Sequence, residues 1–502
     1  MYTFNNLNAH NKYDILKSKD MLRAEAEAVK RGISEDQLME SAGLKVVLAI
    51  KKYWKRCRVI ILCGPGNNGG DGFVVARLLL AQGWPVKVLL LNDVDKIKGV
   101  ASRSLQKFLN SGGNAVSINK DQLPWGDLFV DAFFGSGLSR NLDNKILEIF
   151  SHLMKLKLPI ISIDIPSGIN CDTGSLMGGA IRSDLTVTFF RPKRGHFLLP
   201  GKDFCGDIIV DDIGIPDDVL KVLDNKTFLN NLDKSKFIKK SIKDHKYKRG
   251  HSIIFGAHGM SGASILAAQA ARRIGAGMVT IVAPEKTRNI YISNILGSVF
   301  RPSESFFHFE KFESNLVKIK PNSIIIGPGF GDKVLLKEII QNLSRIMKPI
   351  PNIVLDADAL TCFEGDLDNF IQVTRNMKSK IVITPHEGEF YRLFGEEFKK
   401  FSKPDAVMKA SFLSNATIVL KGNDTIIADS TSEMYFSYNA PLNLATAGSG
   451  DVLAGIIGGL IAQGMIVLDA CRVGVWVHNN AGNLIGKSLI AEDIISILPD
   501  VT

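Results

Sequence analysis

The sequence predicts an α/β protein of two domains, each built around a largely parallel sheet. Apolar runs of four to eight residues alternate with segments of helical period along the chain, and one lysine-rich stretch separates an earlier from a later series. A length of 502 residues indicates two or three domains. The composition, 45% hydrophobic and 22% charged, is that of an ordinary globular protein. This composition excludes a wholly disordered or collagen-like chain.

The earlier series begins with two predicted helices, at 21–29 and from Asp36 onward. Helices also fit between the strands that follow, and this alternation is typical of βαβ units and a parallel sheet. The strands are expected at 58–63, 86–91, 127–134, 159–165, 185–190 and 207–210.

The later series ends in two helices, 450–463 and 470–485, whose small and apolar residues suit close packing. We place the boundary between the series within 216–249, and we expect domains at 1–220 and 236–502 with a linker at 221–235. The strands of the later series are expected at 251–255, 278–282, 323–326, 352–355, 381–384 and 417–420.

The lysine-rich stretch, 233–249, holds eight basic and two acidic residues and carries most of the net charge of +10. Apart from Phe237 and Tyr247, it lacks the aromatic residues that a nucleic-acid site would interleave with basic ones. A solvated connector is the favoured interpretation. We therefore expect no nucleic-acid partner.

Further exclusions follow from patterns that the sequence lacks. The first residues show no signal-peptide pattern, and the apolar stretch 452–462 is shorter than the roughly 18–20 residues that cross a bilayer. We therefore expect a cytoplasmic protein without a membrane partner. The six cysteines form no C-x-x-C pair, which argues against a zinc ribbon, a thioredoxin-type centre or a disulfide framework.

A glycine-rich segment, 64–72 (GPGNNGGDG), follows the first predicted strand and runs into a helix. It contains G-x-G-x-x-G, and Asp93 closes the next strand about where a ribose-binding acid would lie. However, Asn67, Asn68 and Asp71 place oxygen acceptors where a pyrophosphate would bind, and a carboxylate repels phosphate. A nicotinamide-dependent oxidoreductase is therefore disfavoured, and a tight turn without a chemical role is the simpler alternative.

Two more strand ends carry polar residues, at 131–138 (DAFFGSGL) and 164–168 (DIPSG). Because ligands of open parallel sheets bind at the carboxyl ends of strands, we expect these loops to converge beside the glycine-rich segment. The oxygens of Asn68, Asp131 and Ser167 suit an alkali or alkaline-earth cation, and Asp164 is a spare carboxylate for acid–base work. Taken singly, Asp131 or Asp164 could instead cap a helix or a turn.

The later series has one especially informative motif, 447–451 (AGSGD), at the start of a predicted helix. Backbone amides at a helix N-terminus can bind a phosphoryl group, and Asp451 can deprotonate a hydroxyl that attacks it. The alternative is an ordinary capped helix. Other glycine-rich or polar turns follow strands at 256–263, 327–331, 356–360, 384–389 and 421–425.

Two features of the later series have simple explanations. His386 can be a structural hydrogen-bonding residue, because neither H-E-x-x-H nor an acidic cluster makes it a zinc ligand. The segment 486–488 (GKS) is not a Walker A loop, since it lacks the first glycine and follows a helix.

The motifs of the first half resemble those of a known family. LMESAG, GPGNNGGDGFVVAR, FGSGL, IDIPSG with CDTG, and DLTVTFF with a following lysine look like the Rossmann-like epimerase domain of the bifunctional NAD(P)H-hydrate repair enzymes, over residues 15–215. Ser136 stands where that family usually has threonine. The resemblance implies a potassium ion held by Asn68, Asp131 and Ser167. It implies that the hydrated cofactor is held by Asn67, Asn68, Gly69, Gly70, Asp71, Gly135, Ser136, Gly137, Leu138, Ser139, Arg140, Asn141 and Asp164.

The second half, over residues 240–498, resembles the ribokinase-like, ADP-dependent dehydratase domain of the same family through KYKRGHSIIFGAHGMSGA, AARRIGAGMVTI, GPGFG, VLDADAL, ITPHEGEF, VLKGNDT and LATAGSGDVLAGIIGGLIAQG. Glu387, where the family often has proline, and the pair Ala257-His258 depart from its pattern. The resemblance implies substrate contacts at Ala263, Gly329, His386 and Asp451. It implies nucleotide contacts at Lys421, Gly422, Asn423, Asp424, Thr425, Gly448, Ser449 and Gly450.

The expected function is the repair of hydrated NADH and NADPH. The first domain would interconvert the R and S epimers, with Asp164 as proton shuttle and K⁺ polarising the site. The second would dehydrate the S form with ADP as co-substrate, with Asp451 activating the C6 hydroxyl for phosphorylation and Mg²⁺ stabilising the phosphoryl group. The alternative is a ribokinase-like small-molecule kinase fused to a Rossmann-like binding or scaffold module. Small-molecule ligands and a homo-oligomer are expected.

Overall fold

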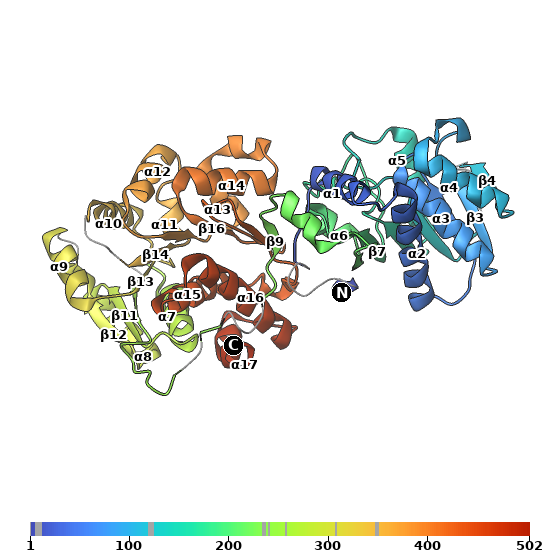
Figure 1. Ribbon diagram of the computed structural model, residues 1–502. Coiled ribbons are helices and arrows are strands. Elements are labelled where there is room, and N and C mark those ends of the chain that lie inside the picture. The colour runs from blue at the N-terminus through green and yellow to red at the C-terminus, as the bar shows by residue number, and fades with distance from the viewer. Residues whose placement is uncertain are drawn as a thin grey trace. The chain divides into compact units, whose positions relative to one another are not determined.

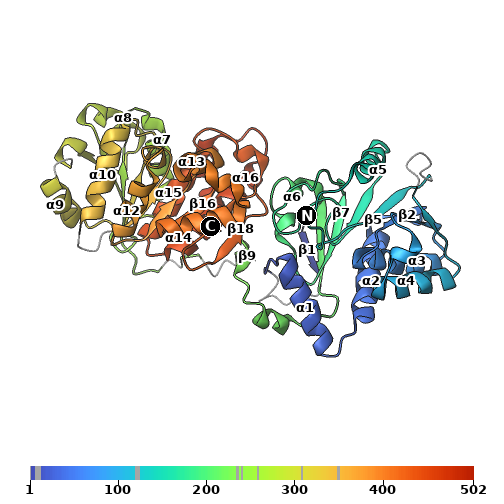
Figure 2. The ribbon, with the colours of Figure 1, turned by 90° about the horizontal axis from the view of Figure 1, so that it is seen from above.

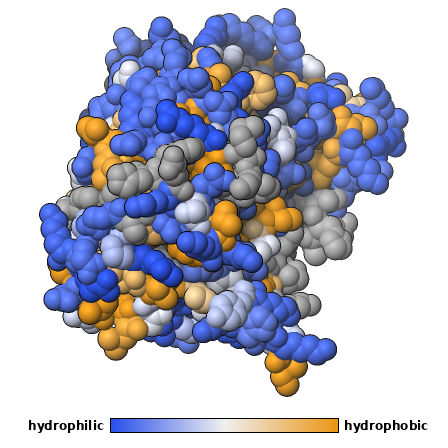
Figure 3. Space-filling view, turned by 90° about the vertical axis from the view of Figure 1, so that its left-hand side faces the viewer, coloured by the Kyte–Doolittle hydropathy of each residue, from blue (hydrophilic) through white to orange (hydrophobic). Residues whose placement is uncertain are grey.

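A computed structural model describes residues 2–5, 13–118, 125–232, 237–238, 241–256, 259–306, 309–346 and 351–502 (Figure 1). The chain divides into two compact units, Met1–Phe228 (unit 1) and Leu229–Thr502 (unit 2), and each is described by itself. On the face of the molecule drawn in Figure 3, apolar residues are scattered in small groups among hydrophilic ones, as on ordinary protein surfaces in water.

Unit 1 is built on a sheet of eight strands, all parallel, in the order β1-β8-β7-β6-β5-β2-β3-β4. The strand order reverses between β2 and β5, and in such doubly wound sheets ligands bind at this point. Six of the strands are those predicted; β1 and β4, of four and three residues, have too little periodicity to be found. The strands are β1 (Tyr2–Asn5), β2 (Val59–Cys63), β3 (Val86–Leu90), β4 (Ala115–Ser117), β5 (Leu128–Ala132), β6 (Ile160–Ile163), β7 (Leu185–Phe189) and β8 (Asp207–Asp211).

Helices cover both faces of this sheet (Figure 2). Alternate residues of β2 point to opposite faces, so Ile61 joins the core with α2, α3 and α4, while Ile60 packs with Phe150 of α5. Both faces are therefore buried, as the continuous apolar runs predict. The helices are α1 (Ser18–Lys30), α2 (Glu35–Tyr53), α3 (Asn67–Ala81), α4 (Gly99–Asn110), α5 (Asn144–Lys155) and α6 (Gly201–Phe204).

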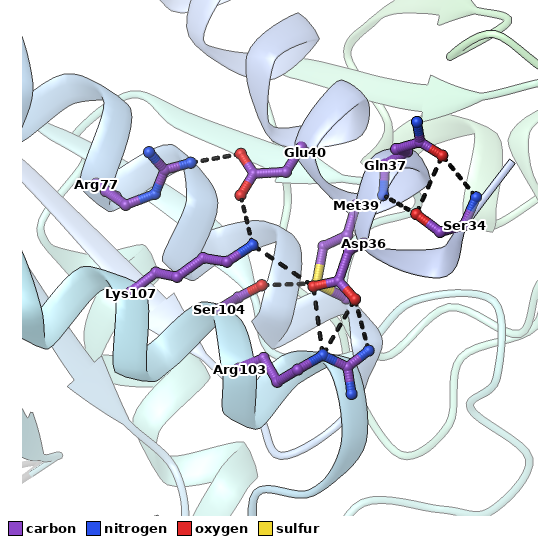
Figure 4. Close-up of polar contacts among 9 residues, drawn as sticks. All are labelled: Ser34, Asp36, Gln37, Met39, Glu40, Arg77, Arg103, Ser104 and Lys107. Carbon is purple, nitrogen blue, oxygen red and sulfur yellow. Dashed lines mark hydrogen bonds and ion pairs between the residues drawn. The ribbon is translucent and has the colours of Figure 1, made fainter.

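An ion-pair network joins the first turns of α2 to α3 and α4 (Figure 4). Asp36 accepts from the guanidinium of Arg103 at 2.6 Å, and Glu40 pairs with Arg77 of α3 and, at 3.2 Å, with Lys107 of α4. Exposed pairs of this kind contribute only about 0–1 kcal/mol each. Their effect here is to fix the N-terminal half of α2, which lines the cavity described below.

Unit 2 is built on a ten-stranded sheet in the order β12-β11-β10-β13-β14-β15-β16-β17-β18-β9. The strands from β12 to β16 are parallel, and β17 and β18 add an antiparallel edge. The α/β prediction is therefore confirmed for both units. The strands are β9 (Thr227–Leu229), β10 (His251–Phe255), β11 (Met278–Ala283), β12 (Val299–Pro302), β13 (Ser323–Ile326), β14 (Asn352–Leu355), β15 (Ile381–Ile383), β16 (Thr417–Leu420), β17 (Ile426–Ala428) and β18 (Met434–Phe436).

Helices lie on both sides of this sheet as well, with α7 and α15 on one side and α12, α13 and α14 on the other (Figures 1 and 2). The glycines of α15 allow close packing, because a Cβ on Gly455 would lie 2.3 Å from the carbonyl oxygen of Ala267 in α7. The helices are α7 (Ser261–Arg273), α8 (Arg288–Asn294), α9 (Phe309–Ile319), α10 (Lys333–Arg345), α11 (Asp358–Thr361), α12 (Leu367–Asn376), α13 (Glu387–Phe394), α14 (Lys403–Ser414), α15 (Ser449–Ala462), α16 (Val467–Ile485) and α17 (Ala491–Val501). Within the described ranges, no helix combines the length and the apolar character needed to cross a membrane.

The division between the units falls inside β9, within the segment 221–235 predicted as a linker. Part of that segment is therefore a strand rather than a free tether. Residues 221–228 also contact unit 1: Leu223 is buried, and Asn225 donates to the carboxylate of Asp14 at 2.9 Å. The lysines at 234, 236, 239 and 240 lie outside the described residues.

These contacts make a prediction about where the chain can be cut. Residues 1–228 and 229–502, expressed separately, should each fold, because each has its own sheet and core. The shorter fragment 1–220 should melt at a lower temperature than 1–228, because it lacks Leu223 and Asn225. Thermal unfolding followed by circular dichroism checks both statements. Equal melting temperatures, or insolubility of 1–228, would contradict the assignment of these residues to unit 1.

Candidate active sites

Unit 1 has a cavity of about 780 Å³ where the strand order reverses between β2 and β5. Helices α1 and α2 close it on one side, and the segments after β2, β5 and β6 line the other. The predicted cofactor-holding residues that line it are Asn67, Asn68, Asp71, Gly135, Ser136, Gly137, Leu138, Ser139, Arg140 and Asp164. Gly69, Gly70 and Asn141 are not among its lining residues.

The glycine-rich segment differs from its predicted loop. Helix α3 begins at Asn67, so Asn67, Asn68 and Asp71 lie in its first turns. The glycines allow this because they face inward: a Cβ on Gly69 would lie 1.9 Å from the carbonyl oxygen of Gly64, and one on Gly70 would meet Met39 at 2.5 Å. Gly69 therefore lets the helix approach the strand end, and Gly70 lets it approach α2, while Asn67, Asn68 and Asp71 on either side of them line the cavity.

Asp164 lies directly after β6 with a left-handed φ of 68°. Its Oδ1 atom is 2.7 Å from the ammonium of the buried Lys193, and its Oδ2 atom accepts from the backbone N–H of Ser136 at 2.8 Å. Burial works against ionisation, but the charge and hydrogen bond of Lys193 outweigh it and lower the pKa of Asp164 to about 2. An aspartate held ionised in this way is a poor proton donor at neutral pH, which argues against its predicted role as proton shuttle.

His196 connects the backbones of these two residues. Its Nδ1 atom accepts from the N–H of Lys193 at 3.0 Å, so Nε2 carries the proton and donates to the carbonyl oxygen of Asp164 at 2.9 Å. Burial and the charge of Lys193 lower the pKa of His196 to about 4, so the ring is neutral. Sequence reasoning missed His196 and used Lys193 only as a strand-end marker, because both reach Asp164 through tertiary contacts.

Two of the predicted cation ligands, Asp131 and Ser167, lie in a second buried group. Asp131 is fully buried and accepts from Ser162 Oγ at 2.7 Å and from Ser167 Oγ at 2.6 Å. No ion pair to Asp131 occurs in the part of the chain that the structure describes. The side-chain Oδ1 of Asn68 is also buried without a partner in the described residues, and it lies beside Gly135. The residue before Gly135, Phe134, donates its backbone N–H to Ser167 Oγ. An uncompensated carboxylate and an unpartnered amide oxygen fit a monovalent cation.

Three further carboxyl groups line the cavity, those of Glu25, Glu35 and Asp71. Burial and the nearby charges of Asp164 and Glu25 raise the pKa of Asp71 well above its ordinary value. Burial and the charge of Asp164 raise the pKa of Glu25, on α1, to about 7. No pattern in the sequence pointed to Glu25, because its position depends on how α1 packs.

In unit 2 the predicted phosphoryl-binding motif lies at the N-terminus of α15, with Gly448 at a φ of 84° before the first turn. Lys421 lies against this turn: its ammonium is 2.8 Å from Asp356 Oδ1 and would be 3.1 Å from a Cβ on Gly450. Burial, then the charges of Asp356 and Glu389, raise the pKa of Asp451 to about 7, although Lys421 opposes the shift. The first amides of the helix, a cation and a carboxyl that titrates near neutrality therefore meet at one place.

The predicted nucleotide-binding turn, Lys421 to Thr425, connects β16 to the antiparallel β17. Its own side chains hold the turn: Gly422 N–H donates to Thr425 Oγ1 at 3.0 Å, and Asn423 donates to the carbonyl oxygen of Ala440 at 2.8 Å. Asp424 is buried and pairs with Lys403 at 2.6 Å. The turn therefore offers a nucleotide its backbone and the ammonium of Lys421 more than its other side chains.

The predicted substrate contacts of unit 2 lie in two places. A Cβ on Gly329 would lie 3.0 Å from the Cβ of Ala263, so these residues are neighbours. His386 caps α13: its Nδ1 accepts from the N–H of Glu389 at 3.2 Å, and its own N–H donates to Glu389 Oε2 at 2.8 Å. The structural interpretation of His386 is therefore correct, and a ligand contact stays a prediction. Ala257 and His258 lie outside the described residues.

The two segments match separate families. Residues 35–195 match the family described as YjeF-related protein N-terminus, and residues 251–499 match NAD(P)H-hydrate dehydratase. Similar solved structures include an ADP/ATP-dependent NAD(P)H-hydrate dehydratase from Bacillus subtilis that was co-crystallised with ATP/Mg²⁺. The two chains are 24% identical, the match covers 52% of this chain and 92% of that chain, and the TM-score is 0.45.

Curated relatives match both units at once. The protein named bifunctional NAD(P)H-hydrate repair enzyme Nnr of Dictyoglomus turgidum is 33% identical over 92% of this chain and 93% of its own. The protein of that name from Coxiella burnetii is 32% identical over 93% of this chain and 94% of its own. The protein of that name from Escherichia coli is 31% identical over 96% of this chain and 94% of its own. The chain therefore belongs to the family of bifunctional NAD(P)H-hydrate repair enzymes.

Proposed function

We propose that this protein repairs hydrated NADH and NADPH in two steps. Unit 1 interconverts the R and S forms of the hydrated cofactor, and unit 2 dehydrates the S form with ADP, giving NAD(P)H, AMP and phosphate. The observation that carries the proposal is the match to bifunctional repair enzymes across both units, at 33% identity over 92% of the chain. A carboxyl group that titrates near neutrality in each unit supports it.

In unit 1 the hydrated nicotinamide occupies the cavity between α1, α2 and the ends of β2, β5 and β6. A volume of about 780 Å³ is that of an ordinary small-molecule site. The residues from Asn67 to Asp71, the loop from Gly135 to Asn141 and Asp164 hold the ligand, and Asp164 gives its site a fixed negative charge. A potassium ion on Asn68, Asp131 and Ser167 would compensate the buried Asp131 and polarise the neighbouring loop.

In unit 2 the chemistry must remove a hydroxyl, and hydroxide is a poor leaving group. Asp451 takes the proton of the C6 hydroxyl, whose oxygen then forms a bond to the β-phosphorus of ADP while AMP leaves. The amides of Gly448, Ser449 and Gly450 stabilise the charge on the transferring phosphoryl group. The C6–O bond then breaks with phosphate as the leaving group, and loss of the C5 proton restores the reduced ring.

Mg²⁺ is expected with the nucleotide. In the described ranges no three His, Cys, Asp or Glu side chains are grouped so that they could hold a metal. This fits an Mg²⁺ ion that would be bound chiefly by phosphate oxygens and water. Asp356 and Glu389 are the carboxylates that lie beside Lys421. The ion would neutralise phosphate charge there. A cytoplasmic location, assembly as a homo-oligomer and the choice of ADP stay predictions.

The full chain, incubated with enzymatically hydrated NADH, ADP, Mg²⁺ and K⁺, tests the proposal. Absorbance of reduced nicotinamide should return completely, in step with AMP and free phosphate, and should require the nucleotide. The R form should be consumed as well as the S form. A stable phosphorylated product without AMP and free phosphate together would indicate the alternative, a small-molecule kinase.

Asp451→Asn should lower the dehydration rate by about 100-fold or more, because the base acts in the transition state. ADP affinity and epimerisation should change little. The pKa of Asp451 is raised from its ordinary value of about 4 to about 7 on folding, so the wild type loses stability as the pH rises from about 4 to 7. The variant should therefore melt increasingly above the wild type over that range, and by a constant margin at higher pH.

The matched control for Asp451→Asn is Asp368→Asn, which changes an exposed aspartate in the first turn of α12. The control should leave the dehydration rate and the pH dependence of melting as they are in the wild type. Full dehydration activity in Asp451→Asn would contradict the assignment of the base.

Asp131→Asn should slow epimerisation and abolish its dependence on K⁺, because the variant removes the buried charge that the cation compensates. Asp127→Asn is the control, since Asp127 lies at the opposite end of β5 and pairs with Arg58. Epimerisation rates measured over a potassium titration check this. An unchanged potassium dependence in Asp131→Asn would remove the cation from this site.

A further inference from the structure

Glu25 stands out on the helix face that closes the cavity of unit 1. Helix α1 contributes Met21, Leu22, Glu25, Ala26 and Val29 to the lining, at the spacing of one helical face. Glu25 is the one charged residue among these five. A half-buried carboxyl on an otherwise apolar stripe costs stability, so its presence at this position needs an explanation other than packing.

The contacts of Glu25 set it apart from its neighbours. Glu27, two residues along α1, pairs with Arg31 at 3.1 Å, and Asp164 takes the ammonium of Lys193 at 2.7 Å. Within the described residues, Glu25 has neither a hydrogen bond nor an ion pair. An oxygen that makes no hydrogen bond is either buried without a partner or accessible, and neither oxygen of Glu25 is buried in that way. Both oxygens are therefore accessible, on a residue that lines the cavity. Both are therefore available to a ligand.

Four carboxyl groups line the cavity, those of Glu25, Glu35, Asp71 and Asp164. Lys193 lowers the pKa of Asp164 to about 2, whereas burial raises the pKa of Asp71 well above its ordinary value. Glu25 has a pKa of about 7, because burial first, and then the charges of Asp164 and Glu35, outweigh the attraction of Lys193. It therefore occupies both protonation states. The titratable and charged groups on the elements around it are Glu35 on α2, Asp71 on α3, Arg140 after β5, Asp164 after β6, Lys193 and His196 at the 3₁₀-helix Arg194–His196, and Asp217, Asp218 and Lys221 on the 3₁₀-helix Asp217–Val222.

We propose that Glu25 is the residue that moves the proton in epimerisation, while Asp164 remains a fixed anion; this inference rests on the proposed function of unit 1. The C6 carbon of the hydrated ring bears both a hydroxyl and the ring nitrogen N1. One oxygen of protonated Glu25 donates its proton to N1 while the other takes the hydroxyl proton. The C6–N1 bond breaks, its electron pair stays on N1, and C6 becomes an aldehyde.

Rotation about the C5–C6 bond then presents the opposite face of the aldehyde to N1. The same proton transfers in reverse form the C6–N1 bond again, with the hydroxyl in the other configuration. Glu25 begins and ends protonated, and no oxidant, reductant or co-reactant is consumed. A carboxyl with accessible oxygens and a pKa near neutrality is required beside the substrate, and Glu25 meets both conditions. Glu25 is half-buried in the cavity wall, whereas Glu35 is exposed at the first residue of α2.

The test uses the full chain, an R and S mixture of hydrated NADH, and excess ADP. Dehydration of the S form gives a fast return of absorbance, and the R form gives a slower phase limited by epimerisation. Glu25→Gln should slow the second phase by about 100-fold or more, down to the rate without protein, and leave the first phase unchanged. Glu27→Gln, on the same helix and outside the cavity, should leave both phases unchanged.

The pH dependence separates a proton carrier from a structural residue. The second phase in the wild type should be level below pH 7 and fall by about tenfold per pH unit above it, because the protonated form of Glu25 is required. Asp164→Asn should keep a pH inflection, shifted to lower pH because the negative charge beside Glu25 is gone. Glu25→Asp, which keeps a carboxyl, should recover part of the rate, and its melting temperature shows whether unit 1 is folded.

Three results would overturn the inference. The first is a second phase in Glu25→Gln that keeps the wild-type rate and pH profile. The second is an inflection that disappears in Asp164→Asn and persists in Glu25→Gln, which would make Asp164 the proton carrier. A wild-type chain that shows the first phase but no second phase beyond the uncatalysed rate would contradict the proposed function of unit 1 itself, and the inference with it.

Discussion

Each unit has a lysine, fully buried in unit 1 and half-buried in unit 2, at the carboxyl edge of its sheet, and the charges around that lysine determine the chemistry of the site. Lys193 pairs with Asp164, and Lys421 pairs with Asp356. Removing one partner of such a buried pair costs about 3–5 kcal/mol, and in unit 1 the charge of Lys193 holds the pKa of Asp164 at about 2. Other carboxyl groups that face the same lysine then lie beside a negative charge in a half-buried place. Glu25 and Asp451 therefore have pKa values of about 7, where proton transfer is efficient.

The backbone makes these charge clusters possible. In unit 1 the reversal of strand order between β2 and β5 opens the cavity, and the inward glycines of α3 let its polar first turn reach the strand end. In unit 2 the glycine at 455 brings α15 against α7 and so fixes the helix N-terminus beside Lys421. Two different topologies thus place a lysine, its carboxylate and a second acid together.

Much of the fold and part of each site could be predicted from the sequence. The twelve apolar runs are strands because both faces of each sheet are buried. The motifs after β2, β5 and β6 contribute residues to the cavity of unit 1, and Lys421 lies against the start of α15. Local patterns could not find Glu25, Lys193 or His196, because nothing near them in sequence shows that they contact Asp164 or share its cavity. The start of α3 was placed six residues late, since glycine and asparagine usually signal a loop.

The central claim is that in each unit one half-buried carboxyl titrates near neutrality, because burial and the charge of a neighbouring lysine-paired aspartate together raise its pKa. Carbon-13 NMR of aspartate and glutamate carboxyl groups in the full chain, followed through a pH titration, measures this directly. We expect one glutamate signal that titrates at a pH of about 7 and is absent in Glu25→Gln, and one aspartate signal that titrates there and is absent in Asp451→Asn. Titration of both groups near the ordinary value of about 4 would contradict the account.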